Sequence, residues 1–159
     1  MNDLMRMDKF LEILRKKPLL FFVISLGYLM AVGFLKWGTS PPWGALWFMA
    51  GAILGIYFLD AAEVFFHLVP SPFRSIIFAA GFVLVSFFVV TSSGSLLASG
   101  LVLSLYLTMI LWQIGQWRVA GNLASWYQMI AGGVGVKTQL WLLTAFALLF
   151  FIETYLFIR

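Results

Sequence analysis

Cysteine is absent from the 159-residue chain, and only 10% of its residues are charged. The absence of cysteine excludes disulfides, thiol catalysis and thiolate metal sites. The scarcity of charge excludes an ordinary soluble domain, in which about 25% of residues are charged and about 45–50% are apolar. Here 63% of residues are apolar, which is more than the core of one small domain can bury. The sequence therefore predicts an integral membrane protein with the lipid bilayer as its main partner.

Long apolar runs divide most of the chain into five segments, each close to the roughly 20 residues that a helix needs to cross the hydrocarbon layer. We predict spans at about 18–36, 43–68, 73–92, 95–117 and 138–158. Pro70 and Pro72 are expected to end the second span, because proline cannot continue the helical hydrogen-bond ladder. A β-barrel would instead show short strands of alternating polarity. The sequence thus predicts an all-α bundle of five transmembrane helices, forming one domain over residues 18–159.

Two amphipathic stretches lie outside these spans. Residues 1–17 carry apolar side chains at helical spacing among basic residues: Met7, Phe10, Leu11 and Leu14. This pattern predicts a short amphipathic helix in the headgroup plane before the first span. Residues 118–137 are predicted to be an interfacial loop. The tryptophan-containing stretch 117–130, which overlaps this loop, is a candidate for a second interfacial helix. A plain charged flank and a plain loop are the alternatives for the two stretches.

The basic residues predict the orientation of the chain in the membrane. If the N-terminus is cytoplasmic, eight basic residues lie on the cytoplasmic side: Arg6, Lys9, Arg15, Lys16, Lys17, Arg74, Arg118 and Lys137. Only Lys36 and Arg159 then lie outside. This bias follows the positive-inside rule. We expect the plasma (inner) membrane, with the N-terminus inside and the C-terminus outside. The net charge of +4 is spread over loops and ends, so we expect no nucleic-acid partner.

The second predicted span carries a stripe of ionisable residues. At about 100° per residue on a helix, Asp60, Glu63 and the only histidine, His67, fall within an arc of about 60°. An Asp-like side chain facing lipid costs about 2.5–3.5 kcal/mol on insertion scales. The stripe is therefore expected to face the bundle interior or a wet crevice. Arg74, just past the proline turn, can fold back towards the two acids and lower the cost of burying them.

Three interpretations of this stripe remain open. The first is a hydrogen-bonded structural clasp of Asp60, Glu63 and Arg74, with His67 at the level of the headgroups. The second is a proton or cation relay, because acids within a membrane are by default functional candidates. The third is a metal site on Glu63 and His67, whose spacing of four residues suits chelation but leaves the ligand set of a transition metal short. The sequence identifies no cofactor.

Two further features of the spans stand out. Glu153 lies in the outer third of the last span, where it either snorkels, bonds to Thr154 or to a hydroxyl of a neighbouring helix, or forms a second station on an ion path. Gly51 and Gly55 are four residues apart on one helical face. Small residues at this spacing let another helix approach closely, so we predict that both glycines serve helix packing.

Two classes of function follow from these features. The first is a small proton- or cation-coupled transporter or channel-like subunit that uses Asp60 and Glu63 and acts as a homo-oligomer. We favour it because an assembly subunit has less need of acids placed this deep. The second is a non-catalytic integral subunit that assembles or stabilises a larger membrane complex with other membrane subunits. An enzyme is less favoured, because no serine stands at a fixed offset from the single histidine to form a nucleophile–base pair.

Overall fold

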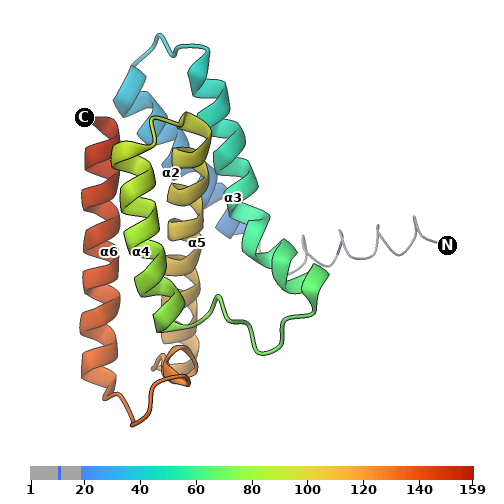
Figure 1. The fold of residues 1–159 in the computed structure, drawn as a ribbon, viewed down its shortest axis with the longest axis vertical. Coiled ribbons are helices and arrows are strands. Elements are labelled where there is room, and N and C mark those ends of the chain that lie inside the picture. Colours follow the sequence, from blue (N-terminus) through green and yellow to red (C-terminus); the bar gives the residue numbers. More distant parts are fainter. Residues whose placement is uncertain (1–10, 12–18) are drawn as a thin grey trace, which may run out of the picture.

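The structure, a computed structural model, describes Leu11 and residues 19–159 and is helical wherever these residues form regular structure (Figure 1). The predicted interfacial helix in residues 1–17 lies outside the described part of the chain, except for Leu11. Residues 19–159 form five α-helices and one 3₁₀ helix: α2 (Leu19–Trp37), α3 (Gly44–Phe66), α4 (Ile76–Ser92), α5 (Leu96–Ala120), η1 (Ala124–Tyr127) and α6 (Val136–Ile158). The prediction of an all-α protein is confirmed for these residues.

Among these helices, α2, α3, α5 and α6 are long and apolar enough to cross a membrane. This finding confirms the prediction of a membrane protein. The fourth predicted span corresponds to α5, whereas the third corresponds to α4, which is apolar but has only 17 residues. At about 1.5 Å per residue α4 is about 26 Å long, slightly less than the roughly 30 Å of a hydrocarbon core. The structure therefore supports four spans by length and composition, and the fifth crossing stays a prediction.

Local hydrogen bonds, more than the prolines, decide where α3 ends and α4 begins. α3 was predicted to reach residue 68 but ends at Phe66, because His67 takes a left-handed conformation with a φ of 50° and donates its N–H to the Glu63 carbonyl. α4 begins at Ile76, three residues later than predicted. Ser75 caps it, since its Oγ accepts from the Phe78 N–H at 3.2 Å.

Successive α-helices run in opposite directions, so that the loops gather at two ends of the bundle (Figure 1). The loops 38–43 and 93–95 lie at the end that also holds the C-terminus, which we call the upper end. The loops 67–75 and 121–135 lie at the lower end. This alternation makes α3 and α5 parallel to each other, with α4 antiparallel to both.

The closest helix contact among the described residues joins α3 to α5. Gly51 and Gly55 on α3 are buried at this contact, as is Gly100 on α5. A Cβ added at Gly51 would meet the backbone of Leu97, and a Cβ added at Gly100 would meet the backbone of Phe48. The two backbones therefore touch because glycine stands at the crossing on each helix.

The segment between α5 and α6 packs on the lower end of the bundle. A continuous interfacial helix over 117–130 is not formed, because α5 runs on to Ala120 and Gly121 then ends it with a φ of 67°. After this turn, the Leu123 N–H donates to Gln139 Oε1 at 2.7 Å, and Trp126 is only 1% exposed. Burial also raises the pKa of the Tyr127 phenol above its ordinary value. Leu123, Trp126 and Tyr127 thus pack on protein, whereas Met129 and Ile130 are exposed. The chain here forms a loop with the short helix η1, which corrects the expectation of a second interfacial helix.

Candidate functional site

The buried acids of the described residues form two separate sites. Asp60 and Glu63 lie in the last seven residues of α3, near the lower end, and define the lower site. Glu153 lies five residues before the end of α6, near the upper end, and defines the upper site. All three side chains are buried within the chain. The acids therefore face protein at two different depths, as the cost of exposing them to lipid requires.

The lower site contains a bidentate ion pair. Arg74 Nε donates to Glu63 Oε1 at 3.1 Å, and Arg74 Nη2 donates to Glu63 Oε2 at 3.2 Å. The guanidinium also lies over the ring of Trp112 on α5, with its central carbon 4.2 Å from the ring centroid. A bidentate, charge-assisted pair is stronger than a neutral hydrogen bond, and the aromatic face adds a cation–π attraction. These contacts tie the end of α3 to the start of α4 and to α5.

Arg74 and Glu63 differ in their access to water. The Arg74 side chain is 43% exposed, whereas that of Glu63 is 6% exposed. Asp60, three residues before Glu63, is only 1% exposed and thus more deeply buried than either partner of the ion pair. The arc predicted from the sequence therefore holds for Asp60 and Glu63, which both face the interior.

His67 does not belong to this arc. It is exposed, and its left-handed backbone takes it off the helix that carries the two acids. The four-residue spacing between Glu63 and His67 consequently loses the helical geometry that suggested chelation. Within the part of the chain that the structure describes, no group of three or more His, Cys, Asp and Glu side chains is placed to hold a metal ion.

The upper site pairs a carboxyl group with a hydroxyl. Ser86 Oγ on α4 donates to Glu153 Oε1 on α6 at 3.0 Å, across 67 residues of sequence. Ser86 is fully buried and Glu153 is 1% exposed. The second carboxylate oxygen, Glu153 Oε2, is buried and has no hydrogen-bond partner among the described residues. This oxygen can therefore accept a hydrogen bond or a cation inside the bundle. The partner of the other oxygen, the Ser86 hydroxyl, carries no charge.

Aromatic side chains pack against α6 next to the upper site. The Phe150 ring, one turn before Glu153 on α6, lies 5.2 Å from the ring of Tyr28 and 5.1 Å from that of Tyr106. The Tyr28 hydroxyl is hydrogen-bonded to Thr154, and the Tyr106 hydroxyl donates to the Phe146 carbonyl at 2.9 Å. Both phenols thus bond to α6 and hold it against α2 and α5.

The sequence singled out Glu153 but not its partner. Ser86, Tyr28 and Tyr106 stand in apolar runs without any spacing that links them to Glu153. The available signal was a hydroxyl in a predicted span, which is too common to identify a partner. Residues of the lower site were easier to find, because Arg74 is the first charged residue after Glu63 apart from His67.

Comparison of the chain with protein-family models gives no match, and comparisons with curated proteins and with solved structures give none. What the described residues define is a class: a helical membrane protein with buried carboxyl groups near both ends of its bundle. Its function has to be inferred from the chemistry of these two sites.

Proposed function

We propose that the protein is a small polytopic membrane transporter or channel-like subunit that moves protons or small cations, with Asp60 and Glu153 as the binding stations. The observation that carries this proposal is the environment of Glu153. Its side chain is 1% exposed, one oxygen accepts from Ser86, and the other has no partner among the described residues. A buried carboxylate of this kind is stabilised by a bound proton or cation, which neutralises it.

Asp60 supplies the second station in this proposal. It is as deeply buried as Glu153 but lies near the lower end of the bundle, whereas Glu153 lies near the upper end (Figure 1). Two acids at different depths suit an ion that crosses the bundle in steps. Glu63 has a different part, because its two oxygens accept from Arg74 and its charge is neutralised in place. We therefore assign Glu63 and Arg74 to a clasp beside the lower station.

The proposed topology has five crossings, including the short helix α4. Of the basic residues in the described chain, three belong to the lower end and two to the upper end: Arg74, Arg118 and Lys137, and Lys36 and Arg159. Together with the basic residues before Leu19, this distribution supports a cytoplasmic lower end under the positive-inside rule. The C-terminus is then outside, and the plasma (inner) membrane is the proposed location.

An assembly subunit is the second candidate, and the exposure of α2 favours it. Only Ser25, Leu29 and Val32 of this helix are buried. A membrane-spanning helix with so little burial has a broad face available for a helix of another chain or of a second copy. In this alternative the acids serve only to hold the bundle together.

Reconstituted vesicles distinguish the two candidates. Purified protein is placed in vesicles that contain a pH-sensitive or cation-sensitive dye, and flux is measured after a gradient is imposed. We expect Glu153→Gln to keep the fold, because the glutamine oxygen can still accept from Ser86, and to reduce flux to the level of protein-free vesicles. Asp60→Asn is expected to do the same. Thr144→Val, on the exposed side of α6, is the control and retains flux.

The proposal fails if the wild-type protein moves neither protons nor cations. It also fails if flux persists unchanged in the double variant of Asp60→Asn and Glu153→Gln. A wild type without flux that becomes stable only with another membrane chain would support the assembly subunit instead.

A further inference from the structure

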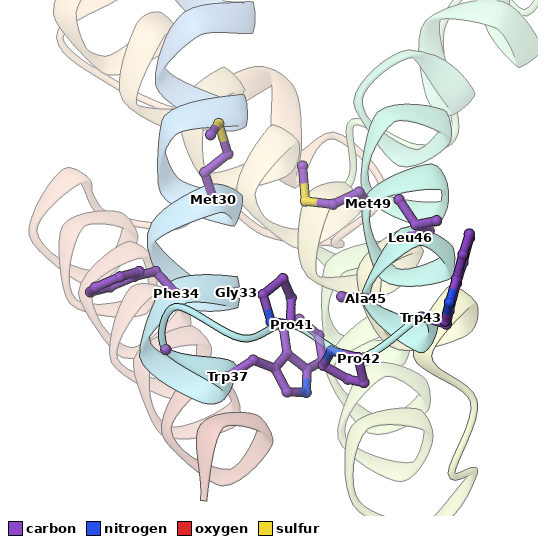
Figure 2. A pocket seen from close by; sticks show the side chains of 11 residues that line it. Met30, Gly33, Phe34, Trp37, Pro41, Pro42, Trp43, Ala45, Leu46 and Met49 are labelled. Atoms are coloured by element: carbon purple, nitrogen blue, oxygen red, sulfur yellow. The ribbon is translucent and has the colours of Figure 1, made fainter.

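An apolar pocket of about 490 Å³ opens between α2 and α3 at the upper end, next to the loop 38–43 (Figure 2). Residues of α2 line one side, residues of α3 line the other, and Pro41 and Pro42 of the loop lie between them. None of its lining residues carries a charge, a hydroxyl or a side-chain amide. The pocket therefore suits a ligand with an uncharged, apolar body.

Small residues create this space. Gly33 on α2 and Ala45 on α3 both line the pocket and leave it unfilled. Two consecutive prolines prevent the loop from continuing either helix. The methionines on the two helices, Met30 and Met49, add flexible apolar side chains that adapt to the shape of a bound chain.

Two indole groups provide the polar part of the pocket. Trp37 and Trp43 belong to its lining, and of the lining residues only these two carry a side-chain N–H donor. Trp37 is held by edge-on contacts with the rings of Phe48 and Phe157, whereas Trp43 is 86% exposed. Tryptophan at the end of a membrane span lies at the interface, with its ring in apolar surroundings and its N–H near polar groups.

We propose that this pocket binds one acyl chain of a membrane phospholipid, whose ester carbonyl accepts from the indole N–H of Trp37 or Trp43. The apolar lining matches the hydrocarbon chain, and the two donors at the interfacial end match the ester. A helix of another chain fits less well. One helical turn, about 10 Å across and about 5.4 Å high, would already take up nearly all of the pocket. The site shares no residue with the two carboxyl sites, so it does not depend on the proposed transport function.

Native mass spectrometry tests this site on the whole protein in mild detergent. The probe is a phospholipid with two ester-linked oleoyl chains, and the measurement is the number of lipids retained per chain as the activation energy rises. We expect the wild type to retain one lipid after the loosely bound lipids on its surface have been lost. Gly33→Phe is expected to fill the pocket and to lower the apparent affinity at least tenfold. A Cβ at Gly33 meets only the Trp37 ring, at 3.5 and 3.7 Å, which is ordinary contact.

Gly27→Phe is the matched control. Gly27 lies on the same helix, is exposed, and would have no neighbour within 4 Å of an added Cβ. It should therefore retain the lipid as the wild type does. Equal retention by the wild type and by both phenylalanine variants would show that the lipid binds elsewhere and would overturn the proposal. A pocket occupied by a second copy of the chain, seen as a dimer without retained lipid, would overturn it too.

A second measurement does not depend on filling the pocket. A phospholipid with ether-linked chains has the same apolar body but lacks the ester carbonyls. We expect the wild type to retain the ester lipid more strongly than the ether lipid. The double variant of Trp37→Phe and Trp43→Phe, which keeps the aromatic bulk but not the N–H groups, should retain both lipids equally. Equal retention of the two lipids by the wild type would refute the assigned hydrogen bond.

Discussion

The sharpest prediction concerns the contact between α3 and α5. Replacing Gly51 or Gly100 with alanine adds one methyl group where the backbone of the other helix already lies. At Gly51 the new Cβ would stand 2.9 Å from the Leu97 carbonyl carbon and 3.0 Å from the Leu101 nitrogen, with the Leu97 oxygen closer still. Gly100 meets the carbonyl of Phe48 in the same way. Backbone atoms within helices cannot move aside as a side chain can, so the two helices must separate.

The expected loss follows from two opposing terms. Alanine is favoured over glycine within a helix by about 1 kcal/mol. Overpacking costs typically about 1–3 kcal/mol, and overlap with backbone belongs at the upper end of this range. We therefore expect Gly51→Ala and Gly100→Ala each to lower the free energy of unfolding by about 2 kcal/mol. The control variants are Gly81→Ala on α4 and Gly115→Ala on α5, whose added Cβ atoms meet nothing within 4 Å.

These variants are compared by unfolding in mixed micelles, with the helical circular dichroism followed as sodium dodecyl sulfate increases. The control variants should be as stable as the wild type or gain up to about 1 kcal/mol from helix propensity. The double variant of Gly51→Ala and Gly100→Ala should lose less than the sum of the single losses, because one separation of the helices relieves both overlaps. If Gly51→Ala and Gly100→Ala unfold together with the controls, the backbones do not touch in the membrane and the reasoning is wrong.

Two further predictions concern the lower site and the topology. Arg74→Gln removes both hydrogen bonds to Glu63 and should lower the free energy of unfolding by about 1–3 kcal/mol, whereas the exposed Arg118→Gln should have no effect. Replacing Glu63 and Arg74 together by glutamine should recover much of this loss, because the double variant leaves no buried carboxylate without its counter-charge; no recovery would contradict the clasp. Cysteines introduced singly at Ser40 and Ser93, at the upper end, should react with an external, impermeant thiol reagent in sealed vesicles. A cysteine at Ser71, at the lower end, should react only after the vesicles are permeabilised.

Much of the helical organisation could be predicted from the sequence, because an apolar run of membrane length allows few alternatives. The helices α2, α3 and α6 begin and end within two residues of the prediction. The misplaced ends depend on local hydrogen bonds. Ser75 caps α4 through a single side-chain bond, and His67 ends α3 through a left-handed backbone. The serines, prolines and phenylalanines around these positions permit several residues as the end of α3 or the beginning of α4. Only the structure identifies the residues at which the helices end and begin.

Of the two helices in the contact between α3 and α5, only the contribution of α3 could be predicted from the sequence. Gly51 and Gly55 were recognisable as a small-residue face on one helix, but their partner helix was not, since glycines occur in four of the five predicted spans. Gly100 completes the contact because α3 and α5 are parallel neighbours. α4 follows α3 in the sequence and returns the chain to the upper end, so that α5 can descend directly against α3. No local pattern in the sequence encodes this path.

The two acidic sites differ in a way that bears on their proposed roles. At the lower site a guanidinium faces Glu63, so the carboxylate has a permanent counter-charge that no transported ion needs to supply. At the upper site the described partner of Glu153 is the Ser86 hydroxyl, which donates one hydrogen bond but brings no charge. Burial penalises an isolated charge far more than a paired one. A proton or cation therefore gains more by binding at Glu153 than at Glu63, and this difference is why we assign the upper carboxyl group to ion binding and the lower pair to structure.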